Sequence, residues 1–152
     1  MTRLMMVGAA ALVFGAAGYA AQAQAALPPV TVYKSSTCGC CSKWVEHLRA
    51  SGFSVEARDV SDAQLEAVGA QAGVTGDLDS CHTALVGGYA VEGHVPAADI
   101  KRMLSEKPAI AGIAVPGMPI GSPGMEQGST TQPFDTIAFT KDGKKTVYAS
   151  HR

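Results

Sequence analysis

Four cysteines are the residues of this chain best suited to chemistry, and they fall into two groups. Three of them lie within four positions, at Cys38, Cys40 and Cys41. The fourth, Cys81, stands far downstream and directly precedes His82. A thiolate is both the nucleophile of disulfide exchange and a soft metal ligand. The pattern therefore indicates either redox chemistry or the binding of a soft metal ion.

The spacing of the first three cysteines allows both kinds of chemistry. Cys38 and Cys41 have the spacing of a dithiol pair, and a helix start would favour their thiolates because unsatisfied N–H groups and the helix dipole stabilise negative charge. Cys40 favours metal binding, since a reductase needs two thiols whereas a multinuclear soft-metal site uses every bridging sulfur. One alternative is a permanent Cys38–Cys41 disulfide with Cys40 buried as a small hydrophobic residue. Another is a disulfide between Cys40 and Cys81.

Two histidines and two methionines are further candidate ligands. His82 follows Cys81, and His94 precedes the last predicted helix; each could bind a metal ion or serve only in hydrogen bonding or packing. Met118 and Met125 each follow a Pro-Gly pair, which suits the centre of a tight turn. Their thioethers suit Cu(I), and a hydrophobic lid is the alternative role.

The N-terminal residues have the three parts of a secretory signal peptide. Arg3 precedes an apolar run from Leu4 to Ala21, and Ala-x-Ala sites follow, so we expect cleavage after Ala25 or Ala23. A retained membrane anchor is the alternative, although the run is rich in Ala and Gly and short of Leu and Ile. The signal predicts export to the periplasm, an oxidising compartment where free thiols form disulfides unless something such as a bound metal protects them.

Removal of residues 1–25 would leave residues 26–152, enough for one compact domain. No second apolar run could span a bilayer, so no membrane contact is expected after cleavage. The formal net charge of the whole chain is -1 and no basic stripe is present, so nucleic acid is not an expected partner.

Other metal sites are less favoured by the sequence. A structural zinc site normally uses two cysteine or histidine knuckles, and the chain has no second knuckle. Four cysteines could hold an iron–sulfur cluster, but an oxidising compartment argues against it. His47 lies off the apolar stripe of its predicted helix and is expected at the surface, and His151, near the C-terminus, is given no role.

Hydrophobic periodicity predicts an α/β domain with the order β-α-β-α-β-β-α. The first helix has an apolar face, the second begins with a capping box at Ser61 and Gln64, and Gly87-Gly88 suits a hairpin turn. The predicted elements are strands at 30–33, 53–59, 83–86 and 89–91, and helices that follow Cys38, Ser61 and Pro96.

This order, with the cysteine cluster between the first strand and the first helix, resembles the thioredoxin/glutaredoxin fold over residues 29–107. Proteins of that fold normally carry a cis-proline in the loop that packs against the cysteine motif. His82 occupies the matching position here, and this departure weakens the interpretation as a disulfide reductase.

The remaining segment, residues 108–152, has a different character. Ala109–Gln132 is rich in Gly, Pro and small residues and shows no helical or strand period, which predicts a long loop with a function. Ile137–Thr140 and Thr146–Ala149 flank a turn and predict a closing β-hairpin.

Four motifs together resemble the CopG family of bacterial periplasmic copper-resistance proteins. They are Cys38-Gly-Cys-Cys41 followed by Trp44, Ser80-Cys-His-Thr-Ala84, Glu92-Gly-His-Val-Pro96 and Val115-Pro-Gly-Met-Pro-Ile-Gly-Ser-Pro-Gly-Met125.

The resemblance implies a thioredoxin-like fold and a cysteine-bridged site for more than one copper ion, held as Cu(I). It also implies a role in copper resistance, with interconversion of Cu(I) and Cu(II) as a copper oxidoreductase activity. Other periplasmic copper-handling or redox proteins would then be partners. A periplasmic thiol–disulfide oxidoreductase that uses Cys38 and Cys41 is the alternative. By motif, the cluster sulfurs would be Cys38, Cys40, Cys41 and Cys81, with His82, His94, Met118 and Met125 as candidates beside them.

Overall fold

A computed structural model describes residues 26–152, which form a seven-stranded sheet packed with three helices. The predicted signal peptide, residues 1–25, lies outside the described residues. Within residues 26–152, no helix has the length and apolar character that crossing a membrane requires.

The predicted order of elements and the predicted closing hairpin are confirmed, and one strand that was not predicted precedes the hairpin. The first part consists of β1 (Val30–Lys34), α1 (Gly39–Ala50), β2 (Val55–Asp59), α2 (Asp62–Ala72), β3 (His82–Val86), β4 (Tyr89–Gly93) and α3 (Ala97–Glu106). The second part consists of β5 (Gly112–Val115), β6 (Phe134–Phe139) and β7 (Lys145–His151).

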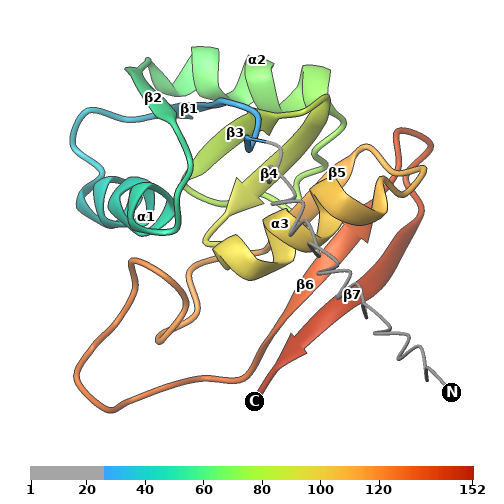
Figure 1. The fold of residues 1–152 in the computed structure, drawn as a ribbon. Coiled ribbons are helices and arrows are strands. Elements are labelled where there is room, and N and C mark those ends of the chain that lie inside the picture. The colour runs from blue at the N-terminus through green and yellow to red at the C-terminus, as the bar shows by residue number, and fades with distance from the viewer. Residues whose placement is uncertain (1–25) are drawn as a thin grey trace, which may run out of the picture.

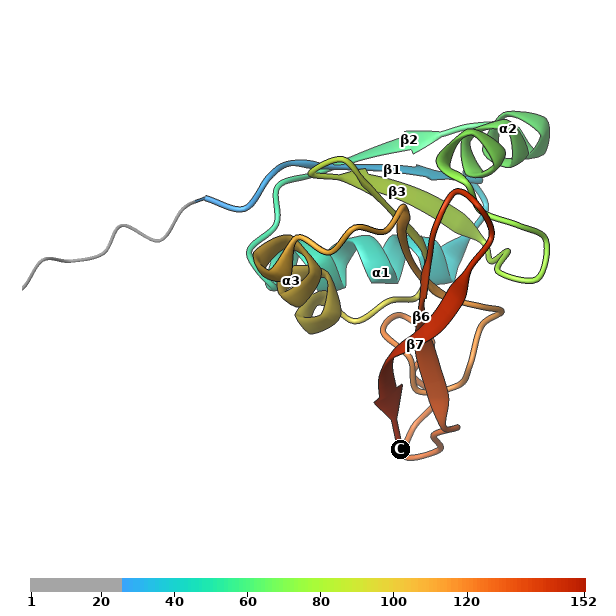
Figure 2. The same ribbon diagram turned by 90° about the vertical axis from the view of Figure 1, so that its right-hand side faces the viewer.

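All the strands belong to one sheet with the order β2-β1-β3-β4-β5-β6-β7. β1 runs parallel to β2 and antiparallel to β3, and β4 runs parallel to β5. Helices α1 and α3 cover one face of the sheet, and α2 covers the other (Figure 1, Figure 2). The similarity to the thioredoxin class in particular stays a prediction.

The larger hydrophobic core lies on the face covered by α1 and α3. Trp44 and Leu48 of α1 meet Ile100 and Met103 of α3 there, and all four are buried. A smaller core on the opposite face contains Val74, Leu78, Ala114 and Phe139. Successive residues of β5 contribute alternately to the larger and the smaller core, because successive side chains of a strand point to opposite faces of the sheet.

The prediction that Ala109–Gln132 has no regular structure was wrong at one point. Gly112–Val115 forms β5, which joins β4 to the closing hairpin and is buried along its whole length. A four-residue strand buried on both faces has no polar–apolar alternation, so periodicity could not identify it. The predicted hairpin is confirmed as β6 and β7, although β6 begins earlier than expected, at Phe134, and β7 extends past both of its expected ends.

Candidate metal centre

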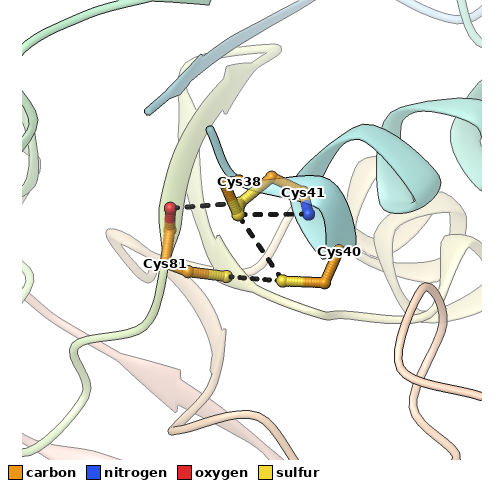
Figure 3. Close-up of side chains that lie close together, drawn as sticks. All are labelled: Cys38, Cys40, Cys41 and Cys81. Carbon is orange, nitrogen blue, oxygen red and sulfur yellow. Dashed lines mark hydrogen bonds between the residues drawn. A yellow bond between two sulfur atoms is a disulfide. The ribbon is translucent and has the colours of Figure 1, made fainter. Parts of the chain in front are cut away.

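The first turn of α1 holds three of the four cysteines (Figure 3). Cys38 is the N-cap of the helix, and its sulfur accepts a hydrogen bond from the backbone N–H of Cys41 at 3.3 Å. Cys41 faces the core and is fully buried, whereas Cys40 is only half-buried. A helix start with unsatisfied N–H groups therefore presents these sulfurs, as the sequence predicted.

The sheet brings Cys81 to the same place. β1 pairs with β3 so that Lys34 lies opposite His82, and Cys81 therefore sits just beyond the end of this pair, where the chain leaves β1 for α1. The sulfur of Cys81 lies 3.9 Å from that of Cys40, and the sulfur of Cys40 lies 3.5 Å from that of Cys38 (Figure 3). All four sulfur atoms lie within 4.8 Å of one another.

Two of these sulfurs are covalently joined. Cys38 and Cys41 form a disulfide, while Cys40 and Cys81 are free thiols. The alternative disulfide between Cys40 and Cys81 is not formed. The other alternative combined a Cys38–Cys41 disulfide with a buried Cys40, but Cys40 is only half-buried. A site that uses all four sulfurs as ligands therefore requires reduction of the Cys38–Cys41 bond.

Both predicted histidines approach the sulfur of Cys81. Nε2 of His94 lies 3.1 Å from this sulfur, and Nδ1 of His82 lies 3.4 Å from it. The two imidazole rings are buried and meet edge to face, with 5.0 Å between their centroids. The ring of His82 also packs on Trp44, and its Nε2 has no hydrogen-bond partner. Cys81, His82 and His94 thus form a second group of atoms that could hold a metal ion.

Burial keeps these groups uncharged. It raises the pKa of the Cys81 thiol to about 12, with a contribution from the neighbouring Cys40. It lowers the pKa of His82 to about 3, helped by His94, and it also lowers the pKa of His94. A neutral imidazole has a free nitrogen lone pair, whereas the Cys81 thiol must lose its proton before it can bind a metal ion.

The loop that carries the methionines is anchored at two points beside the cysteines. At the first Pro-Gly turn, the carbonyl of Gly117 accepts a hydrogen bond from the Ser80 hydroxyl at 2.6 Å. At the second, the carbonyl of Pro123 lies 2.8 Å from Nδ1 of His94. Met118 is 51% exposed and Met125 is half-buried. A ligand role for these two methionines stays a prediction.

Glu92 supports the segment that carries Cys81, a role that the sequence analysis missed. Its buried carboxylate accepts hydrogen bonds from the backbone N–H of Ser80 at 2.9 Å and from the hydroxyl of Thr83 at 2.7 Å. Burial raises the pKa of Glu92 to about 7. The only sequence signal was its position in the Glu92-Gly-His94 motif.

A cleft of about 620 Å³ opens onto the sulfur cluster from the side of α2. Cys38 and Cys81 line one end of it, whereas the buried Cys41 does not reach it. Its remaining wall includes the carboxylates of Asp62, Glu66, Asp79 and Glu92, and no lysine or arginine. The cleft thus opens Cys38 and Cys81 to solvent, and its carboxylates favour cations over anions there.

Comparison with known proteins agrees with this arrangement. The family model described as a protein of unknown function, DUF411, matches residues 78–125, which include Cys81, both histidines and both Pro-Gly-Met turns. No curated protein matches the chain. A solved structure named copper resistance protein copG, form 1, is 41% identical, with a TM-score of 0.77 over 82% of this chain and 98% of that chain. A second, named form 2, is also 41% identical, with a TM-score of 0.76 over 83% and 99%.

Fold and site together define a mixed α/β protein with a cysteine–histidine cluster that is capable of holding metal. At this identity and coverage, the chain belongs to the CopG family of copper resistance proteins, as its motifs predicted.

Proposed function

We propose that this protein binds several copper ions in the periplasm and protects the cell from copper by holding them as Cu(I) between cysteine sulfurs. The observation that carries the proposal is the convergence of Cys81 with the three cysteines of α1, within 4.8 Å of one another. Soft sulfur ligands select Cu(I), and bridging sulfurs allow a small site to hold more than one ion. The periplasmic location rests on the predicted signal peptide.

The protonation of the candidate ligands supports the binding of a soft cation. Cys81 holds its proton because burial disfavours the thiolate, and a bound cation reverses this balance by compensating the charge. Binding of copper should therefore release protons. His82 and His94 would contribute neutral nitrogen ligands beside the sulfurs.

Met118 and Met125 would complete the site from the loop side. The turns that precede them are tied to Ser80 and His94, the neighbours of the cysteine cluster. A thioether carries no charge and needs no deprotonation, so it could bind Cu(I) or cover the site without changing its proton balance.

We also propose that the Cys38–Cys41 pair interconverts Cu(I) and Cu(II). Two thiolates and two Cu(II) ions would give one disulfide and two Cu(I) ions, since each ion accepts one electron. The disulfide between these residues supports this proposal because it represents the oxidised state of the pair.

The test is the copper content of the fully reduced protein under anaerobic conditions. We expect more than one Cu(I) per chain, with ultraviolet absorption from thiolate-to-copper charge transfer. The double variant Cys40→Ser with Cys81→Ser should lose most of the copper, whereas Ser36→Ala, at an exposed position, should retain it. Absence of copper from the wild type, or its retention in the double variant, would refute the proposal.

A second candidate function is favoured by the same disulfide. Cys38 is the half-exposed member of the pair and lines the cleft, as an attacking sulfur in a thiol–disulfide oxidoreductase would need to be. This function predicts that Cys38→Ala abolishes the reduction of a test disulfide protein while Cys40→Ala has little effect. The proposed copper-binding function predicts instead that Cys38→Ala and Cys40→Ala both impair copper binding.

A further inference from the structure

The acidic residues of this protein differ in whether a basic residue accompanies them. Eight of the thirteen form ion pairs with a lysine, arginine or histidine. Within residues 26–152, four of the remaining five line the cleft beside the cysteines: Asp62, Glu66, Asp79 and Glu92. Glu92 is buried and bound by Ser80 and Thr83, whereas the other three are exposed. This acidic cleft therefore carries negative charge that no ion pair within the described part of the chain neutralises.

One wall of the acidic cleft is a single face of α2. Asp62, Glu66 and Ala70 follow one another at intervals of four residues, and Leu65 and Gly69 lie between them. Residues three and four positions apart share a face of a helix, so this wall presents an apolar side chain between two carboxylates and only small residues beyond them. A ligand that fits the wall is extended along the helix and has basic and apolar side chains close together.

The acidic cleft gives access to one sulfur of the disulfide and not to the other. Cys38 is half-exposed and lines the cleft, whereas Cys41 is fully buried. A nucleophile in the cleft therefore meets the sulfur of Cys38, and the sulfur of Cys41 becomes the leaving group. That sulfur lies 3.3 Å from the carbonyl oxygen of Cys81, to which the Cys41 thiol can donate a hydrogen bond once it has gained a proton.

We propose that the acidic cleft is the docking site of a partner protein that reduces the Cys38–Cys41 disulfide. The segment that enters the cleft is extended and carries two cysteines, flanked by lysine or arginine and by apolar side chains. Opposite charges on two surfaces speed their encounter and disfavour partners of the wrong charge. The inference rests on the proposed function, because copper binding by all four sulfurs requires this reduction.

The exchange balances with the partner as the only reductant. One thiolate of the partner bonds to the sulfur of Cys38, and the Cys38–Cys41 bond breaks with its electron pair on Cys41, which takes up a proton. The second thiolate of the partner then attacks the partner sulfur of this mixed disulfide and releases Cys38, which also takes up a proton. Two electrons and two protons pass to the protein, and the partner leaves as a disulfide.

The test uses the copper-free protein with its disulfide intact and two synthetic peptides that share the same pair of cysteines. Lysines flank the cysteines in one peptide, and glutamates flank them in the other. Alkylation and mass analysis follow the loss of the Cys38–Cys41 bond. Each rate is divided by that of the same peptide with a small uncharged disulfide, which corrects for the reactivity of its thiols. At low salt we expect the lysine peptide to react at least about tenfold faster, and high salt should reduce this ratio.

Substitutions inside and outside the acidic cleft locate the effect. Asp62→Asn with Glu66→Gln should lower the ratio of the two rates by about threefold or more, because it removes two of the exposed charges. Asp142→Asn with Glu106→Gln removes the same charge at exposed positions that do not line the cleft and should leave the ratio unchanged. Dithiothreitol, a small uncharged dithiol, should reduce all of these proteins at the same rate.

The same samples separate this inference from the proposed function. The docking site is overturned if the two peptides react equally fast with the wild type, if Asp62→Asn with Glu66→Gln leaves their ratio unchanged, or if only dithiothreitol reduces the disulfide. Copper is then measured anaerobically in protein that has been reduced and freed of reductant, where a content of several ions leaves the proposed function standing. If the lysine peptide is preferred but the reduced protein binds no copper, the docking site stands and the proposed function fails.

Discussion

Gly124 lies so close to Cys40 that no side chain fits between the loop and α1. A Cβ atom on Gly124 would lie 2.8 Å from the carbonyl oxygen of Cys40 and 2.9 Å from the backbone nitrogen of Trp44. Both atoms belong to the backbone of α1, so they cannot move aside without disturbing its first turn. Gly124 also has a φ of +88°, a conformation that side chains disfavour. The loop that positions His94 is therefore fitted directly onto the helix that carries the cysteines.

Gly124→Ala should lower the free energy of unfolding by about 2–4 kcal/mol, because it adds overpacking to the cost of a left-handed backbone. Gly143→Ala is the matched control, since Gly143 has a φ of +84° and nothing within 4 Å of its added Cβ. This control should cost only about 1 kcal/mol. Urea unfolding measures the free energy of unfolding of both variants. Equal losses of this free energy would show that contact between position 124 and α1 contributes nothing to the effect of Gly124→Ala.

His47 provides a second prediction, through a contact that the sequence did not indicate. Its Nε2 accepts a hydrogen bond from the backbone N–H of Ala97 at 3.1 Å, at the start of α3, where Pro96 provides no side-chain cap. Burial lowers the pKa of His47 below its ordinary value. The folded protein thus binds this proton less readily than the unfolded chain does, so the stability that depends on neutral His47 is present above about pH 6.5 and is lost as the pH falls.

His47→Gln should make stability less sensitive to acid, because the glutamine oxygen can accept the same hydrogen bond without titrating. Between about pH 7 and pH 5, we expect the wild type to lose about 1 kcal/mol more than the variant, the usual value of a helix cap. Urea unfolding of both proteins at the two pH values is the measurement. A difference between them that does not change with pH would contradict the role given to His47.

Much of the fold could be predicted because local signals agreed with one another. The capping box at Ser61 and Gln64 is present, and the predicted apolar face of α1 is buried. Such features depend on neighbours a few residues apart, and these are visible in the sequence. β5 was missed because a short strand is defined by its partners β4 and β6, which are distant along the chain.

In the candidate site too, some features follow from local sequence signals and others depend on residues that are distant along the chain. The order of motifs was enough to predict that Cys81 lies near the cysteines of α1 and that His94 could reach the same end of the sheet, since all of them lie at strand or helix ends. The support of Cys81 by Glu92, and of His94 by Pro123, could not be predicted, because these bonds depend on side-chain packing and on the path of an irregular loop. The disulfide state was likewise open, since the sequence allowed more than one pairing.

Trp44 offers a direct optical measure of the site. It is the only tryptophan of the chain, it is fully buried, and its ring centroid lies 4.4 Å from that of His82. His82 in turn contacts the sulfur of Cys81. Copper at Cys81 should therefore quench Trp44 emission, and the quenching should saturate at the copper content found by metal analysis. The Cys40→Ser, Cys81→Ser double variant should show no quenching; copper binding by the wild type without any change in emission would place the ion elsewhere.

A buried hydrogen-bond group ties the closing hairpin to α3. The carboxylate of Asp99 accepts a hydrogen bond from the hydroxyl of Thr136 in β6 at 2.6 Å, and Nε2 of His151 in β7 lies 2.9 Å from the same oxygen. His151 also stacks on Phe134. The expectation that His151 has no role was wrong, because the hairpin brings this residue back to α3.

Thr136→Val should lower the free energy of unfolding by about 1–3 kcal/mol, since it leaves the buried carboxylate of Asp99 without one of its donors. Thr146→Val makes the same chemical change at an exposed position of β7 and should alter stability by no more than about 0.5 kcal/mol. Copper affinity should be equal in both variants and the wild type, because no contact of Thr136 reaches the cysteines. Loss of copper binding in Thr136→Val alone, in protein that remains folded, would mean that the hairpin supports the metal site as well as the fold.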